Sequence, residues 1–324
     1  MLNISAAEVD AALDHAGLVE TLRSAFAEGA VQPARHHHLV ERPDGAASTL
    51  LLMPAWTDFA GPDRDGFVGV KIVSVSPDNT LVGKPAVMGI YVLMDGRTME
   101  PVALIDGQRL TLWRTACASA LASTYLSRPD SRRLLVIGAG ALAPFLARAH
   151  AAVRPISRIS VWNRTPANAE RVAAALRAEG FAAEAAGDLD TAIGEADIVT
   201  AATISTVPLV KGELLRQGTH VDLVGAFSPA MRESDEAAFA RASVYVDTRA
   251  GALKEAGDVV QAIAEGALKP QDIRGELSEL VRGTAVGRRS ADEITLFKSV
   301  GAAIEDLAAA ISVYRKVVGD APGR

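Results

Sequence analysis

A glycine-rich turn between an expected strand and an expected helix constrains the fold of this chain more than any other segment. The apolar run 134–137 leads into residues 138–143, which read Gly-Ala-Gly-Ala-Leu-Ala, and a helical stretch continues to residue 149. In this pattern Gly138 would make the tight turn, Gly140 would let a pyrophosphate approach the backbone, and Ala143 would let the helix pack on the strand. The N–H groups that open the helix would bind the pyrophosphate. A tight turn in an ordinary α/β protein is the alternative explanation.

The rest of the C-terminal half supports the first explanation. After Pro129, short β-rich runs alternate with helical stretches, which is typical of βαβ units and a parallel sheet. We therefore expect an α/β protein with a Rossmann-type doubly wound parallel sheet in residues 117–301, as the NAD(P)-binding domain. The expected strands are 133–137, 158–162, 196–200, 220–224 and 244–246.

The N-terminal part has a different pattern. Residues 1 to about 30 are expected to form a helix, and β-rich runs follow at 49–53, 67–75, 87–94 and 102–105. Asp-Gly pairs at 95–96 and 106–107 favour hairpins, so a mainly antiparallel sheet is predicted, with a helix at 111–126 after it. The tail 302–318 is expected to be helical. We assign residues 1–116 and 302–324 to an α+β domain for substrate binding and dimerisation.

Composition and charge exclude several classes of protein. The 324 residues are 49% hydrophobic with a net charge of −6, and no basic run stands out that could bind nucleic acid. The longest apolar runs are too short to span a bilayer, and the N-terminus has no signal-peptide pattern, so we expect a cytoplasmic protein without membrane contact. The single cysteine, Cys117, excludes an internal disulfide and is expected to pack in a helix.

The end of the second expected Rossmann strand bears on the choice of cofactor. An Asp or Glu usually holds the ribose 2′-hydroxyl of NAD at this point, whereas this chain has Asn163, Arg164 and Thr165. Arginine can bind a 2′-phosphate through charge-assisted contacts, so NADPH is favoured, although NADH stays possible. The alternative is that Arg164 is simply a solvated surface residue.

Several further motifs, spread over nearly the whole chain, together carry a family resemblance. They are Gln-Pro-Ala-Arg at 32–35, Gly-Val-Lys at 69–71, Arg-Thr-Ala-Cys-Ala-Ser-Ala-Leu-Ala at 114–122, and Ile-Thr-Leu-Phe-Lys-Ser-Val-Gly at 294–301. With the glycine turn, they resemble the ornithine cyclodeaminase/μ-crystallin family. The resemblance implies a two-domain homodimer in which the N-terminal sheet builds the dimer and half of the active site.

The resemblance also implies roles for individual residues. Arg35, Lys71 and Arg114 match cations that bind the substrate carboxylate, and Lys71 is the candidate catalytic residue; the alternative is that each of the three pairs with an acidic side chain. Val300 would contact substrate and Ser299 the nicotinamide, while Lys298 stands where an acidic residue is common. The residues expected to bind the cofactor are Thr115, Gly138, Gly140, Ala141, Leu142, Ala143, Asn163, Arg164, Thr165, Thr203, Val224, Gly225 and Ser299.

One departure from the family pattern indicates the reaction. Cyclodeaminases carry an Asp shortly after the Rossmann strand that is expected here at 220–224, where this chain has Phe227, which cannot relay protons to a departing amine. The run Gly-Ala-Phe-Ser-Pro-Ala-Met-Arg-Glu at 225–233 resembles the bacterial Δ1-pyrroline-2-carboxylate reductases. This implies reduction of that cyclic imine to L-proline and of Δ1-piperideine-2-carboxylate to L-pipecolate, in trans-3-hydroxy-L-proline degradation. An ornithine cyclodeaminase (an ammonia-lyase), a crystallin-like NADPH-binding protein and an alanine dehydrogenase remain alternatives.

Three consecutive histidines follow Arg35. On a strand only His36 and His38 share a face, and two ligands do not make a closed zinc site, so no metal is predicted. The histidines are candidates for a proton donor or polar contact near the substrate, or for surface positions.

Overall fold

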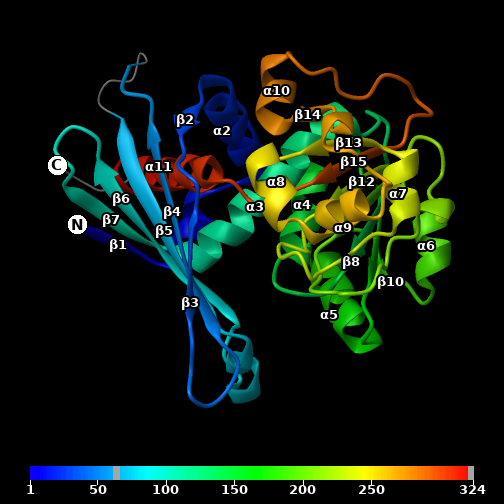
Figure 1. The fold of residues 1–324 in the computed structure, drawn as a ribbon, viewed down its shortest axis with the longest axis horizontal. Helices are drawn as coiled ribbons and strands as arrows, with labels where there is room; N and C mark the ends of the chain where they lie inside the picture. Colours follow the sequence, from blue (N-terminus) through cyan, green and yellow to red (C-terminus); the bar gives the residue numbers. More distant parts are fainter. Residues whose placement is uncertain (61–65, 320–324) are drawn as a thin grey trace. The chain divides into compact units, whose positions relative to one another are not determined.

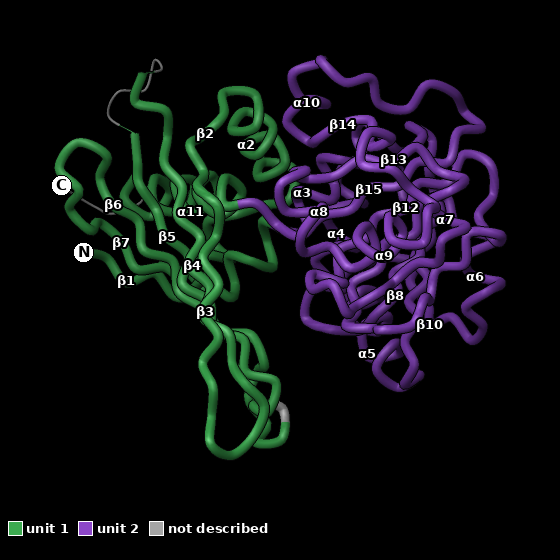
Figure 2. Tube along the Cα trace, in the orientation of Figure 1, with its two compact units in different colours: residues 1–114, 303–324 green, residues 115–302 purple. Residues whose placement is uncertain are grey.

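The computed structural model describes residues 1–60 and 66–319, and its backbone divides into two compact units (Figure 2). Unit 1 is Met1–Arg114 with Ala303–Arg324, and unit 2 is Thr115–Ala302. The expected segments 1–116 with 302–324 and 117–301 differ from this division by two residues at one boundary and one at the other.

Unit 1 is built on a sheet in which β3 (His36–Val40) pairs with β4 beside the main strand path. Every neighbouring pair is antiparallel except β1 and β7, which are parallel. All four β-rich runs expected from the sequence lie within β4 to β7. The main path is β1 (Leu2–Ile4), β7 (Pro101–Asp106), β6 (Val87–Asp95), β5 (Phe67–Val75), β4 (Ser48–Thr57) and β2 (Ala30–Val31).

The single helix expected over residues 1–30 is wrong. The segment forms the strand β1 and two helices, α1 (Ala6–Ala12) and α2 (His15–Glu28). Leu13 is extended, and Asp14 caps α2 by accepting a hydrogen bond from Gly17 N, so the helical pattern restarts there. Helix α11 (Ala303–Gly319) packs on α2 and on strands β4, β5 and β6.

The two Asp-Gly pairs have different outcomes. Asp95-Gly96 lies in the turn between β6 and β7, as predicted. Asp106-Gly107 instead starts helix α3 (Gly107–Leu126), where Asp106 Oδ1 accepts from Arg109 N. The short 3₁₀ helix η1 (Pro77–Val82) follows β5.

Unit 2 contains a sheet in which every neighbouring pair is parallel, so the predicted doubly wound Rossmann-type sheet is confirmed (Figure 1). Chain order runs outward from β8 in one direction and resumes at β11 on its other side, and ligands bind beyond the carboxyl ends of the strands at such a switch point. The spatial order is β10 (Ala183–Ala185), β9 (Arg158–Trp162), β8 (Arg133–Ile137), β11 (Ile198–Ala201), β12 (His220–Leu223), β15 (Thr295–Lys298), β13 (Ser243–Val246) and β14 (Gly275–Glu276).

Both faces of this sheet are buried, which explains why its strands are continuous apolar runs. Leu134 and Val136 join one core with α4 and α5, whereas Leu135 and Ile137 join the other with α6 to α9. The helices are α4 (Ala143–Val153), α5 (Pro166–Ala178), α6 (Leu189–Glu195), α7 (Glu236–Arg241), α8 (Arg249–Glu255), α9 (Gly257–Ala264) and α10 (Leu277–Arg282), with the 3₁₀ helices η2 (Gly212–Leu214) and η3 (Pro270–Asp272).

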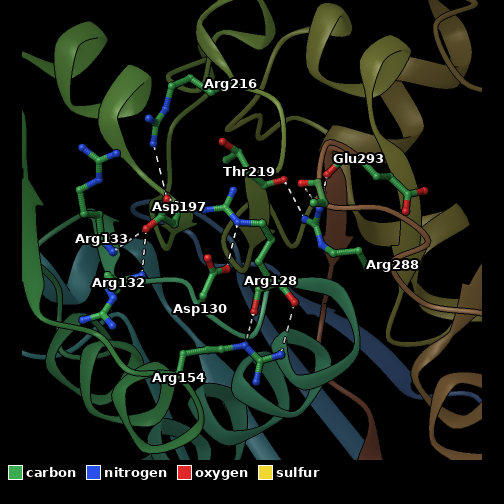
Figure 3. A network of polar contacts seen from close by, with 12 residues as sticks. Arg128, Asp130, Arg132, Arg133, Arg154, Asp197, Arg216, Thr219, Arg288 and Glu293 are labelled. Atoms are coloured by element: carbon green, nitrogen blue, oxygen red, sulfur yellow. Dashed lines mark hydrogen bonds and ion pairs between the residues drawn. The ribbon is translucent and has the colours of Figure 1, made fainter.

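Arginines brace the amino ends of the parallel strands (Figure 3). Arg128 Nη2 lies 2.8 Å from Asp197 Oδ1, and Arg154 and Arg288 donate to carbonyls at the end of α3. Because the strands are parallel, their amino ends lie on the side of the sheet opposite to their carboxyl ends, where a Rossmann cofactor binds. A depression of about 420 Å³ here is therefore not the cofactor site; it is lined by Arg128, Pro129, Asp130, Arg288, Arg289, Ser290 and Ala291.

Candidate cofactor and substrate sites

The glycine turn after β8 has the backbone geometry that its sequence predicts. Gly138 has a φ of 107°, and a Cβ there would lie 2.7 Å from the carbonyl oxygen of Ala202. Its N–H donates to Trp162 O at 2.8 Å, which ties the turn to β9. A Cβ on Gly140 would meet no atom within 4 Å, so space is open beside this residue. The turn therefore requires glycine at 138 and leaves room at 140 for a group to approach the backbone.

The start of α4 is suited to bind an anion. Its cap residue, Leu142, makes no side-chain hydrogen bond to the helix, and Ala141 beside it is exposed. Ala143 begins the helix and is buried in the core with α5. Ala143 N donates to Gly140 O at 3.2 Å and Pro144 has no N–H, so a phosphate group would be bound by the other N–H groups of the turn and of the helix start. These residues fit the pyrophosphate of a dinucleotide.

The residues after β9 form a turn with a free cation. Asn163 Nδ2 donates to Thr165 O at 3.1 Å, which fixes the turn before α5. Arg164 is exposed and makes no hydrogen bond or ion pair with any residue in the described ranges. Its guanidinium is therefore available for a ligand.

Three further loops, at the carboxyl ends of β11, β12 and β15, hold the remaining residues expected near the nicotinamide, apart from Thr115, which lies on α3. Thr203 N and Oγ1 donate to Glu233 Oε1 at 2.6 and 2.9 Å. Val224 N donates to Ala201 O at 2.8 Å, and Ser299 N donates to Leu223 O at 3.1 Å. The loops thus follow neighbouring strands of one sheet edge, as the parallel topology requires.

Two buried residues that the sequence did not single out for binding hold these loops in place. Asp247, at the end of β13, accepts from Val300 N and Gly301 N, both at 2.7 Å. Lys298 is fully buried and donates to the carbonyl oxygen of Gly225. Its position, unexplained from the sequence, is thereby accounted for: it faces acidic groups inside the fold. Lysine is rarely buried without acidic partners, so a lysine within this apolar run could have indicated buried carboxylates nearby.

In unit 1, two of the predicted carboxylate-binding cations converge on one carboxylate. Lys71 Nζ, from the middle of β5, lies 3.0 Å from Asp306 Oδ1, and Arg114 Nε, from α3, lies 3.0 Å from the same oxygen. Arg114 Nη1 also lies 2.6 Å from Glu305 Oε2. All four side chains are buried. Helix α11 therefore supplies Lys71 and Arg114 with buried counterions, as the alternative of pairing with acidic side chains expects, and binding of a substrate carboxylate by these cations stays a prediction.

Neighbouring strands make the space for this cluster. Lys71 pairs with Tyr91 of β6 in the sheet register, and both side chains are buried on the face that α11 covers. A Cβ on Gly69 would lie 2.0 Å from the Tyr91 hydroxyl, so glycine is required there. That hydroxyl has no hydrogen-bond partner among the described residues, which leaves a buried polar atom facing the cluster.

The electrostatics of the cluster alter the basicity of Lys71. Burial lowers the pKa of Lys71 to about 8, helped by Arg114 and Arg35, while Asp306 opposes the shift. Burial acts to lower the pKa of Arg114 as well, but Asp306 and Glu305 hold it above its ordinary value. Arg35, directly before β3, thus lies within electrostatic range of Lys71. An amine that titrates near neutral pH is suited to proton transfer.

The comparison with protein families decides the affiliation of this chain. A model described as the Ornithine cyclodeaminase/mu-crystallin family matches residues 3–321. The chain belongs to this family. The resemblance inferred from the motifs is confirmed.

Two relatives in the ornithine cyclodeaminase/μ-crystallin family show how similar this chain is to known members. Protein SAR DEFICIENT 4 of Arabidopsis thaliana is 42% identical over 87% of this chain and 86% of its own length. A Delta(1)-pyrroline-2-carboxylate reductase of Paracoccus denitrificans is 40% identical over 84% of each chain.

A solved structure of the same kind is also similar. It is the Thermococcus litoralis Delta(1)-pyrroline-2-carboxylate reductase in complex with NADH and L-proline, with 34% identity and a TM-score of 0.92 over 98% of each chain. The similarity in fold to the Thermococcus litoralis reductase therefore covers unit 1 and unit 2, each taken by itself.

The residue expected, from the family resemblance, to separate this chain from cyclodeaminases is accessible. Phe227 is 40% exposed and follows Ala226, which has a φ of 48°. His36, His37 and His38 all lie exposed on β3, and no group of three potential ligands in the described ranges could hold a metal.

One further finding concerns membranes. Among the described helices, none combines the length and apolar character that crossing a bilayer requires.

Proposed function

We propose that this chain reduces Δ1-pyrroline-2-carboxylate to L-proline, and its six-membered homologue to L-pipecolate, with a nicotinamide cofactor. The observation that carries the proposal is the buried cluster of Lys71, Arg114 and Asp306, which pairs a carboxylate-binding arginine with an amine of lowered pKa. The names of the Paracoccus denitrificans and Thermococcus litoralis reductases agree with this activity.

The reaction adds a hydride to the imine carbon and a proton to the ring nitrogen. When bound, the reduced cofactor supplies the hydride. Arg114 and Arg35 hold the substrate carboxylate, since a guanidinium offers a planar pair of donors to it. Lys71 gives its ammonium proton to the nitrogen, and Asp306 keeps that ammonium charged until the transfer. Phe227 and Val300 supply apolar contact for the ring.

Phe227 also favours reduction over the cyclodeaminase alternative. Loss of ammonia from a diamine needs a group that takes up and returns protons near the departing amine. A phenyl ring has none, whereas reduction of a preformed imine needs one hydride from the cofactor and one proton, which Lys71 supplies. A crystallin-like binder would not need the buried Lys71–Asp306–Arg114 arrangement, whose charges cost desolvation.

NADPH is the proposed cofactor. The unpaired, exposed Arg164 at the end of β9 supports this preference, because a guanidinium there gains a charge-assisted contact only if the ribose carries a 2′-phosphate. The Thermococcus litoralis reductase is described with NADH, so the preference is proposed for this chain alone.

A homodimer is proposed from the outer face of the unit 1 sheet. Helices α2 and α11 belong to the core on one face, while the opposite face carries rows of apolar side chains. Leu52, Ile72 and Ile90 form one such row, and Ile90 is 42% exposed. An exposed apolar sheet face is typical of an interaction surface, and a second copy would cover it. A cytoplasmic location and a place in trans-3-hydroxy-L-proline degradation stay predictions.

One assay tests the proposed activity. The oxidation of NADPH is followed with Δ1-pyrroline-2-carboxylate, Δ1-piperideine-2-carboxylate, or pyruvate plus ammonia as substrate. We expect turnover with both cyclic imines and at most slow turnover with pyruvate. Preferential turnover of pyruvate would assign the chain to the alanine dehydrogenases instead.

A further inference from the structure

Three titratable side chains of unit 2 meet inside the fold. Lys298 Nζ, on β15, lies 3.2 Å from Oδ2 of Asp258, which is on α9. The same nitrogen lies 3.9 Å from Oε2 of Glu233, which is in the loop before α7. All three are completely buried. We call these residues the Lys298 triad. Burying such groups costs desolvation free energy, so we looked for a function that this cluster could serve.

The triad is bonded directly to two loops that are expected to hold the nicotinamide. Lys298 donates to the carbonyl of Gly225, and Glu233 accepts from the amide and hydroxyl of Thr203. A Cβ on Gly225 would lie 2.1 Å from Thr203 O and 2.4 Å from Glu233 Oε1. The two loops and the triad are thus packed without room for a side chain at residue 225.

The charge of the triad depends on which groups are ionised. Burial raises the pKa of Glu233 to about 8, with Asp258 adding to the rise and Lys298 opposing it. At neutral pH Glu233 is therefore mostly protonated, and the Lys298 ammonium balances the Asp258 carboxylate. Asp258 is itself held by the N–H groups of Glu233 and Ser234 at 2.7 and 2.9 Å. The ammonium of Lys298 keeps the triad electrically neutral.

We propose that the Lys298 triad sets the preference of this protein between the reduced and the oxidised cofactor. The inference rests on the proposed function, which places the nicotinamide at the loops of Thr203 and Gly225. The nicotinamide ring is neutral when reduced and positively charged when oxidised. A net negative charge buried beneath those loops would stabilise the oxidised form, whereas a neutral triad leaves the reduced form, the hydride donor, able to compete. Lys298 is a positioning residue for Gly225 and a charge-balancing one for the cofactor.

The test measures the dissociation constants of NADPH, by its fluorescence, and of NADP⁺, by competition, and compares their ratio. Lys298→Met removes the positive charge, and we expect it to shift the ratio at least about tenfold towards NADP⁺, which is about 1.4 kcal/mol of differential binding. The double variant Lys298→Met/Asp258→Asn restores neutrality and should bring the ratio back. If Lys298 acted only on the structure, the ratio in the double variant should not return to the wild-type value, because the second substitution removes further contacts. Lys269→Met, at an exposed lysine, is the matched control.

A second measurement needs no substitution of Lys298 and applies even if that variant does not fold. Raising the pH from 7 to 9 ionises Glu233, which faces Lys298 and Asp258, so the wild-type ratio should move towards NADP⁺. Glu233→Gln should abolish this movement, which separates it from the titration of Lys71 in unit 1. A ratio that stays constant in folded Lys298→Met, or a pH effect that persists in Glu233→Gln, would overturn the inference. Failure of wild-type protein to bind either cofactor would instead overturn the proposed function.

Discussion

Lys71 Nζ lies 2.8 Å from Asp306 Oδ2, and both side chains, from a strand and a helix 235 residues apart, are buried. Arg114 shares the other oxygen of the same carboxylate. Asp306 therefore controls the charge on the proposed proton donor and the position of the proposed carboxylate-binding arginine at once.

The first prediction concerns pH. Asp306 raises the pKa of Lys71 against the lowering by burial, so Asp306→Asn should lower that pKa below about 8. If the ammonium is the acid, kcat/KM falls as the pH rises through this pKa, and the fall should begin at lower pH in the variant. Rates between pH 6 and 10 check this. Lys71→Met should remove the fall together with most of the activity, and an unshifted profile in Asp306→Asn would exclude Lys71 as the donor.

The second prediction concerns Arg114. Arg114→Ala should lower kcat/KM about a hundredfold or more while leaving NADPH affinity nearly unchanged, because a charge-assisted contact to the substrate is lost. It also leaves the buried carboxylates of Asp306 and Glu305 short of a partner, so we expect a loss of roughly 3–5 kcal/mol in the free energy of unfolding. Denaturant unfolding measures this. Arg114→Ala/Glu305→Gln should recover part of the stability but none of the activity. Near-normal kinetics in Arg114→Ala would show that the substrate site lies elsewhere.

The third prediction concerns the cofactor. Wild-type protein should prefer NADPH over NADH by about tenfold in kcat/KM, or about 1.4 kcal/mol. Arg164→Asp should shrink or invert that preference by replacing a cation with a repelling carboxylate. Arg158→Ala, which removes an exposed arginine at the other end of β9, is the control and should leave the preference unchanged. Equal use of both cofactors by the wild type would contradict the role given to Arg164.

The fourth prediction concerns Phe227. Phe227→Ala should raise the KM for the cyclic imines by about tenfold through lost apolar contact, whereas Leu253→Ala, at a similarly exposed apolar residue on α8, should not. Ammonia should not form from L-ornithine with either cofactor. An ammonia assay checks this, and measurable release by the wild type would replace the proposed reaction with the cyclodeaminase alternative.

The fifth prediction concerns assembly. Ile90→Glu places a charge in the apolar outer face of the unit 1 sheet and should shift the protein from dimer to monomer in light scattering. Val286→Glu, at an exposed apolar residue of unit 2, should leave the mass unchanged. A wild-type protein that is monomeric at micromolar concentration would refute the proposed dimer.

Much of the fold could be predicted from local pattern. The alternation of short β-rich runs with helical stretches after Pro129 identified the parallel sheet of unit 2, and the glycine turn identified the strand that begins it. The strand β15 was not predicted, since the short run Thr-Leu-Phe-Lys ends in a lysine that only distant acidic groups make tolerable. The break between α1 and α2 was missed as well, because the apolar spacing continues across Asp14 while its side chain caps a new helix.

The sequence by itself determined the chemistry that is available: a glycine turn for a pyrophosphate, a cation after β9, and the separate residues Arg35, Lys71 and Arg114. Only the tertiary structure decided which charges meet. Asp306 and Glu305 lie in a helix far along the chain, so no local spacing links them to Lys71 and Arg114. Lys298 likewise acquires its partners only when β15 inserts beside β12. The physical reason is that ion pairs inside a protein depend on position in space and on burial, and neither is encoded in short-range sequence pattern.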